Sequence, residues 1–187
     1  MTSFLGSIQA TDESLVAGFF QRSVGEWRSD RRYYTLPDGE PKELVSQITI
    51  RFLEQGCAEL RRLADLHQLD DPAIMVCGAE VSWDSSESVS GKKQSSGSTL
   101  FGVKGNLLYR DRGFATTQPV TASFYCPNPD TLCLKTEYKG SVFEEELKLI
   151  GQQYRTRQTI ISRASEQIMI GQYLEKRLVS ATHTESL

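Results

Sequence analysis

The sequence has few of the residues on which metal binding and acid–base catalysis most often depend. Only two of its 187 residues are histidines, His67 and His183. Its four cysteines include no closely spaced pair; they are Cys57, Cys77, Cys126 and Cys133. This spacing argues against a structural zinc site and against a disulfide framework. We therefore expect no metal, and we expect the thiols to be reduced and buried as small apolar side chains.

Long apolar runs and common catalytic motifs are also missing. A membrane helix needs about 20 consecutive apolar residues, and a signal peptide carries a basic segment before an apolar one. Neither pattern occurs, and neither does G-x-S-x-G or H-E-x-x-H. These absences predict a cytoplasmic protein without membrane insertion, and they exclude the usual serine hydrolase and zinc peptidase sites.

The chain lacks an excess of positive charge. Its formal net charge is -3 and its isoelectric point is about 5.5, which argues against binding to nucleic acid. Residues 28–34 contain three arginines and two tyrosines and imitate a basic, aromatic patch. We interpret this segment as the solvated face of a strand.

Two stretches carry apolar residues at helical spacing. Asp12 is the expected N-cap of the first, and the apolar residues that follow are Leu15, Val16, Phe19, Phe20, Val24 and Trp27. The second stretch covers residues 57–68 and places Leu60, Leu63 and Ala64 on one face. We expect an N-terminal helix and one short inserted helix.

Most of the remaining chain alternates with a period of two residues, which is typical of β-strands. Turn residues separate the expected strands, which cover 27–36, 44–53, 73–84, 97–104, 106–111, 113–126, 131–138, 141–150, 153–163 and 166–177. The Ser-rich segment 85–98 is expected to form a long mobile loop. Residues 179–187 are expected to form a flexible C-terminal tail.

About ten sequential strands predict an all-β fold, an antiparallel up-and-down β-barrel formed by residues 1–178 as one domain. Closure of the barrel would leave no strand edge exposed. A barrel of this size can enclose one small ligand. We therefore look for function among the side chains that point into it.

The strongest candidate site lies in the strands expected at 141–150 and 153–163. Alternation places Glu145 on the apolar face of the first strand, and a hairpin brings the second strand, with Arg155 and Arg157, beside it. The arginines either point to solvent as surface ion pairs or line the barrel and bind carboxylates of a ligand. Trp83 similarly fits either the core or the wall of the barrel mouth. The pattern alone predicts a barrel that binds an anionic, largely apolar small molecule.

Three separated runs resemble the CpcS/CpeS family of phycobiliprotein lyases. They are FFQRSVGEWRSDRRYY at residues 19–34, LLYRDRGF at 107–114 and YRTRQT at 154–159. The resemblance extends from about Phe19 to Leu178. It implies a barrel similar to those of lipocalins and fatty-acid-binding proteins, with no permanently bound cofactor.

The resemblance also implies an activity and its site. The substrate would be a bilin such as phycocyanobilin or phycoerythrobilin, attached through a thioether to a cysteine of an apo-phycobiliprotein subunit of the phycobilisome. Arg155 and Arg157 would bind the bilin propionates, and Glu145 would face the tetrapyrrole nitrogens as the catalytic residue. The remaining bilin-binding residues would be Trp83, Arg28 and Thr159, the last of which keeps the hydroxyl where the family often has Ser.

The resemblance implies a lyase of the cyanobacterial cytosol or plastid stroma that works as a homodimer or as a heterodimer with a paralogous lyase. Two alternatives stay open. One is a non-catalytic carrier of bilin or fatty acid, and the other is a partner subunit of a heterodimeric lyase.

Overall fold

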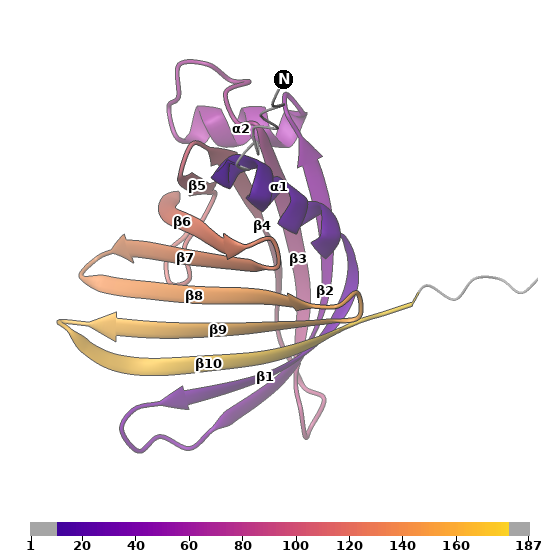
Figure 1. Ribbon diagram of the computed structural model, residues 1–187. Helices are drawn as coiled ribbons and strands as arrows, with labels where there is room; N and C mark the ends of the chain where they lie inside the picture. The colour runs from indigo at the N-terminus through magenta and orange to yellow at the C-terminus, as the bar shows by residue number, and fades with distance from the viewer. Residues whose placement is uncertain (1–10, 180–187) are drawn as a thin grey trace, which may run out of the picture.

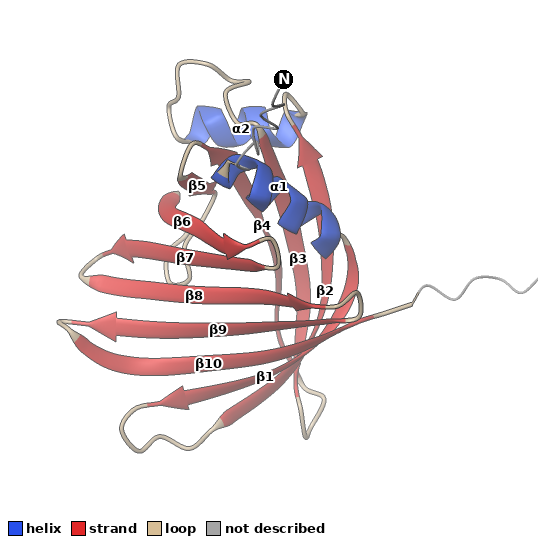
Figure 2. Cartoon of the chain, viewed as in Figure 1, coloured by secondary structure: helices blue, strands red, loops and turns tan. Residues whose placement is uncertain are grey.

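The computed structural model describes residues 11–179, which form ten antiparallel strands and two helices (Figures 1 and 2). Each strand pairs with its neighbours in sequence, and β1 pairs with β10 to close the barrel. The elements are α1 (Asp12–Ser23), β1 (Gly25–Thr35), β2 (Lys42–Glu54), α2 (Ala58–Leu66), β3 (Cys77–Glu87), β4 (Lys93–Lys104), β5 (Leu107–Arg110), β6 (Val120–Asn128), β7 (Thr131–Tyr138), β8 (Ser141–Ile150), β9 (Tyr154–Arg163) and β10 (Glu166–Arg177). The predicted fold class is confirmed.

Helix α1 lies across one end of the barrel, with Val16, Phe19 and Phe20 buried. Its N-cap is Thr11, whose side chain accepts a hydrogen bond from the amide of Ser14, so the assignment of the cap to Asp12 is wrong by one residue. The helix ends at Ser23. Trp27 fits the helical spacing, but it belongs to β1, where its ring is fully buried in the barrel core.

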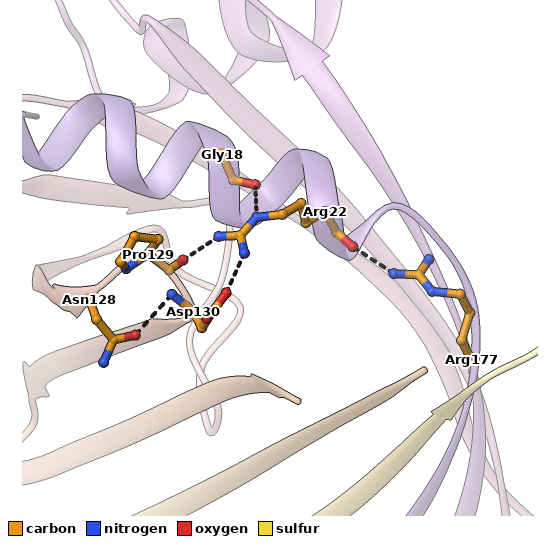
Figure 3. A network of polar contacts seen from close by, with 6 residues as sticks. All are labelled: Gly18, Arg22, Asn128, Pro129, Asp130 and Arg177. Atoms are coloured by element: carbon orange, nitrogen blue, oxygen red, sulfur yellow. Dashed lines mark hydrogen bonds and ion pairs between the residues drawn. The ribbon is translucent and has the colours of Figure 1, made fainter. Parts of the chain in front are cut away.

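Two arginines hold α1 in place (Figure 3). The Arg22 guanidinium donates to the carboxylate of Asp130 and to the carbonyl of Pro129 in the turn between β6 and β7. Arg177, at the end of β10, donates from Nη2 to the Arg22 carbonyl at 2.6 Å and from Nη1 to the Val24 carbonyl. Because the last carbonyls of a helix lack partners within it, a cation at this end both satisfies them and matches the helix dipole. The helix is therefore fixed to the β6–β7 turn and to the end of β10.

Two apolar clusters stabilise the fold. The larger lines the interior of the barrel beneath α1. The smaller lies outside the barrel, where Leu60 and Leu63 of α2 pack on β4 and β5. Gly102 makes this close approach possible, because a Cβ at this position would lie 2.2 Å from the sulfur of Met75 and 3.0 Å from Leu63. No helix between residues 11 and 179 has the length and apolar content needed to cross a lipid bilayer.

The structure corrects two of the predicted segments. Residues 85–98 are not a long loop, because β3 continues to Glu87 and β4 begins at Lys93. Backbone pairing of β3 with β2 and with β4 holds this hairpin, whose strands carry no apolar side chain between Ser85 and Ser98. The buried hydroxyls of Ser46 and Ser85 lie 2.6 Å apart. Conversely, the strand expected at 113–126 begins only at Val120. The predicted tail, apart from Val179, lies outside the described residues.

We predict that Leu63→Ala lowers the free energy of unfolding by about 2–5 kcal/mol, because it opens a cavity beneath α2. Leu63 is 1% exposed, whereas Leu66 on the same helix is 46% exposed. Leu66→Ala is therefore the matched control and should change stability by less than about 0.5 kcal/mol. Urea unfolding followed by circular dichroism measures both, and equal losses would show that α2 does not dock through Leu63.

Candidate functional site

A cavity of about 310 Å³ lies inside the barrel beneath α1. Most of its wall is apolar and comes from strands all around the barrel. Charged side chains interrupt this wall, and they are Arg31, Arg110, Arg112, Glu145, Arg155 and Arg157. Within residues 11–179 no three His, Cys, Asp or Glu side chains converge in a way that could hold a metal ion.

Glu145 points into this cavity, as its place in the alternation of β8 predicts. It is 5% exposed, while its neighbours Glu144 and Glu146 are exposed on the outer face. Its two carboxylate oxygens face different arginines. Oε1 accepts a hydrogen bond from Nη2 of Arg157 on β9, and Oε2 lies 3.5 Å from Nη1 of Arg110 on β5. Glu145 is therefore held from two sides of the barrel.

The electrostatic surroundings of the two arginines differ. Burial lowers the pKa of Arg157, but the attraction of Glu145, Tyr173 and Glu175 outweighs this effect and leaves the pKa above its ordinary value. Burial also lowers the pKa of Arg110, and Glu145 offsets only part of that decrease. Both guanidinium groups have a buried Nε without a hydrogen-bond partner among the described residues.

Arg155 has a different environment from Arg157, although the two are adjacent on the inner face of β9. Its Nε donates to Oε2 of Glu175 at 2.5 Å, and both side chains are almost completely buried. Burial alone would raise the pKa of Glu175, but Arg155, Arg157 and Arg31 outweigh it and lower the pKa. Arg155 and Arg157 are thus each paired with a carboxylate of the protein, but the side chain of Arg157 is 22% exposed and that of Arg155 only 6%.

Trp83 lines the cavity, and its ring lies against Gly97, where a Cβ would come within 2.9 Å of it. Thr159 pairs with Glu145 in the β8–β9 register and is 2% exposed, behind the residues that line the cavity. Arg28 does not fit the expected site. Its side chain is 56% exposed on the outer face and pairs with Asp30, because the inward positions of β1 are those of the odd-numbered residues such as Arg31.

The structure adds residues to the cavity wall that sequence reasoning missed, among them Arg31, Arg110 and Tyr173. Both Arg31 and Arg157 lie against the Tyr173 ring, with guanidinium carbons 5.5 and 5.0 Å from its centroid. Arg31 donates from Nε to Ser29 and forms no ion pair with a carboxylate of the described residues. Continuing the inward alternation from Trp27 through Ser29 would have found it. Arg31 and Arg157 can bind the carboxylates of an elongated, otherwise apolar ligand.

The closed topology places the protein among the antiparallel up-and-down β-barrels, and the cavity lies in its interior. The particular family follows from comparison with known proteins. The family model described as CpeS-like protein matches residues 16–178. The chain therefore belongs to the CpeS-like family, and the resemblance found in its sequence motifs is confirmed.

Individual relatives agree with this assignment. A Nostoc protein named "Putative phycocyanobilin lyase CpcS 2" is 65% identical over 179 residues, which cover 96% of this chain and 99% of the relative. A chromophore lyase CpcS/CpeS from Thermosynechococcus vestitus is 31% identical over 79% of this chain and 84% of its own. The structure of the S-type phycobiliprotein lyase CPES from Guillardia theta matches with a TM-score of 0.72 and 22% identity, covering 88% of this chain and 97% of that one. At this identity the likeness supports the fold.

We predict that Glu175→Gln costs about 3–5 kcal/mol of stability, because it leaves the Arg155 cation buried without its anion. The matched control is Glu144→Gln on the exposed face of β8. A variant in which Arg155→Met accompanies Glu175→Leu removes both charges and should regain most of the loss. Thermal unfolding compares the variants, and a Glu175→Gln protein as stable as the control would contradict this role.

The same pair predicts a pH dependence. The pKa of Glu175 is lowered in the folded state. Its ionised form therefore contributes fully to the stability of the fold above the pKa of the unfolded carboxyl group, about 4.3. This stabilisation is lost as the pH falls through the lowered pKa of the folded state. The stability gap between the wild type and Glu175→Gln should therefore narrow on acidification. A gap that widens would contradict an ionised Glu175.

Proposed function

We propose that this protein is a bilin lyase. It binds a linear tetrapyrrole, phycocyanobilin or phycoerythrobilin, inside its barrel and attaches it by a thioether to a cysteine of an apo-phycobiliprotein subunit. The observation that supports this most strongly is Glu145 between Arg110 and Arg157 in the wall of an otherwise apolar cavity. The names of its relatives support the same activity.

The chemistry of the cavity suits such a ligand. A bilin is a chain of conjugated pyrrole rings with two propionates near its middle, and the cavity offers aromatic walls with reachable cations, among them Arg31 and Arg157. Its volume of about 310 Å³ falls within the usual range for small-molecule sites, roughly 300–1,000 Å³. The carboxylate of Glu145 can accept hydrogen bonds from the pyrrole N–H groups and favour a protonated, more electrophilic tetrapyrrole.

The nucleophile belongs to the acceptor protein. Its thiolate sulfur bonds to the exocyclic carbon of the ring A ethylidene, a proton is added at the ring carbon, and nothing leaves. The thiols of this chain suit the reaction poorly. Burial raises the pKa of Cys77 and of Cys126 to about 11, so both stay protonated and unreactive near neutral pH. The lyase then contributes proximity and orientation.

The test of this function mixes the protein, a bilin and an apo-phycobiliprotein. We expect a covalent adduct with one defined absorption band, formed at least about tenfold faster than without the protein. A yield and spectrum equal to those of the spontaneous reaction would contradict the proposal. Bilin binding without acceleration would identify a carrier, and activity only together with a paralogue would identify a partner subunit of a heterodimer.

We predict that Arg31→Gln and Arg157→Gln each weaken bilin binding about tenfold or more, because each removes a charge-assisted hydrogen bond to a propionate. Arg28→Gln is the matched control, because Arg28 lies on the same strand as Arg31 but points outward. Absorption titrations give the dissociation constants.

The affinity of one double variant tests whether Arg155 also binds a propionate. If the variant with Arg155→Met and Glu175→Leu loses as much affinity as Arg157→Gln, Arg155 binds a propionate directly, as the family resemblance implies. We expect this variant to bind bilin with unchanged affinity, because Arg155 already forms an ion pair with Glu175.

A further inference from the structure

Arg110 is a buried cation in the cavity wall, contributed by the four-residue strand β5. Its guanidinium carbon lies 4.9 Å from the ring centroid of Phe101 and 5.2 Å from that of Phe114. The only carboxylate among the described residues with which it forms an ion pair is that of Glu145. The side chain is therefore confined between two aromatic rings and directed at Glu145.

Hydrogen bonds from neighbouring elements fix the backbone at this position. Nε2 of His67, just after α2, lies 2.9 Å from the carbonyl oxygen of Arg110. The carboxylate of the next residue, Asp111, accepts hydrogen bonds from the amide of Leu100 at 2.9 Å and from the hydroxyl of Thr99 at 2.7 Å. Arg110 is thus anchored to α2 and β4 and does not depend on a ligand for its position.

The two arginines around Glu145 are unequal in their access to the cavity. The side chain of Arg157 is 22% exposed, while that of Arg110 is 7% exposed. A ligand carboxylate can reach Arg157, where it would compete with Glu145 for the same guanidinium. When it does so, Arg110 is the cation that remains beside Glu145.

We propose that Arg110 is a positioning residue for Glu145, an inference that rests on the proposed function. It holds Oε2 of Glu145 and compensates its charge while Arg157 binds a bilin propionate. Oε1, released from Arg157, then faces the pyrrole N–H groups. Arg110 therefore acts on transfer through Glu145, and the affinity for the bilin depends on Arg157 and Arg31.

The test separates binding from transfer in Arg110→Gln. We expect a bilin dissociation constant within about threefold of the wild type, because the propionate contacts remain. The single-turnover transfer rate should fall about tenfold or more. The absorption band of the bound bilin should shift in the direction produced by Glu145→Gln. Arg110→Lys, which keeps the charge, should recover most of the rate.

A double-mutant cycle shows whether Arg110 acts through Glu145. In the Glu145→Gln background, Arg110→Gln should slow transfer by less than about twofold, because residues that act as one unit are not additive. Independent, multiplying losses would overturn the proposal, and so would an affinity loss equal to that of Arg157→Gln, which would make Arg110 a propionate ligand. A wild-type rate in Arg110→Gln would overturn it as well.

A replacement variant and a spectral readout test the role of Arg110 if Arg110→Gln does not fold or if the wild type does not accelerate transfer. If circular dichroism shows that Arg110→Gln does not fold, Arg110→Met in the Glu145→Gln background removes both charges and replaces it in the cycle, with Arg110→Lys as the charged comparison. If the wild type binds bilin without accelerating its transfer, the proposed function fails, and the shift of the bound bilin's absorption band still tests Arg110.

Discussion

The pairing of β1 with β10 joins the two ends of the described chain, and the interior depends on it. The register places Ser29 opposite Glu175 and Arg31 opposite Tyr173. Without this seam the sheet would be open, and the cavity would lose the wall on which Arg31 and Arg157 meet the Tyr173 ring. Closure therefore both removes the strand edges and assembles the charged side of the cavity.

Charge inside the barrel is divided between two carboxylates with different surroundings. Glu175 is enclosed with Arg155 near the buried Trp27, whose ring lies 5.2 Å from the Arg155 guanidinium carbon. Glu145 lies at the cavity and shares its oxygens between two arginines. The enclosed pair of Glu175 with Arg155 suits a structural role. Glu145, which can exchange its partner Arg157 for another group, suits a functional role.

Much of the fold could be predicted from the sequence, because alternation with a period of two residues marks each strand and the inward position of Glu145. The Ser-rich hairpin that begins at Ser85 could not be predicted. Backbone hydrogen bonds hold it, and its side chains show no apolar alternation that would mark strands. The sequence shows Arg28 and Arg31 equally as charged residues of one strand. Arg31 points inward because it lies an even number of residues from the buried Trp27, and Arg28 points outward because it lies one residue from it. The partner of Arg155, Glu175, lies directly opposite it in the β9–β10 hairpin, whereas Arg110 on β5 meets Glu145 on β8 across the interior, a contact that local sequence does not encode.

Arg22 and Arg177 fasten α1 across one end of the barrel, and both helices lie at that end (Figure 1). The proposed function therefore leaves the opposite rim for an elongated ligand to enter. Of its two ends, the one that enters last would lie nearest an acceptor thiol, so the direction of entry would decide which end can react.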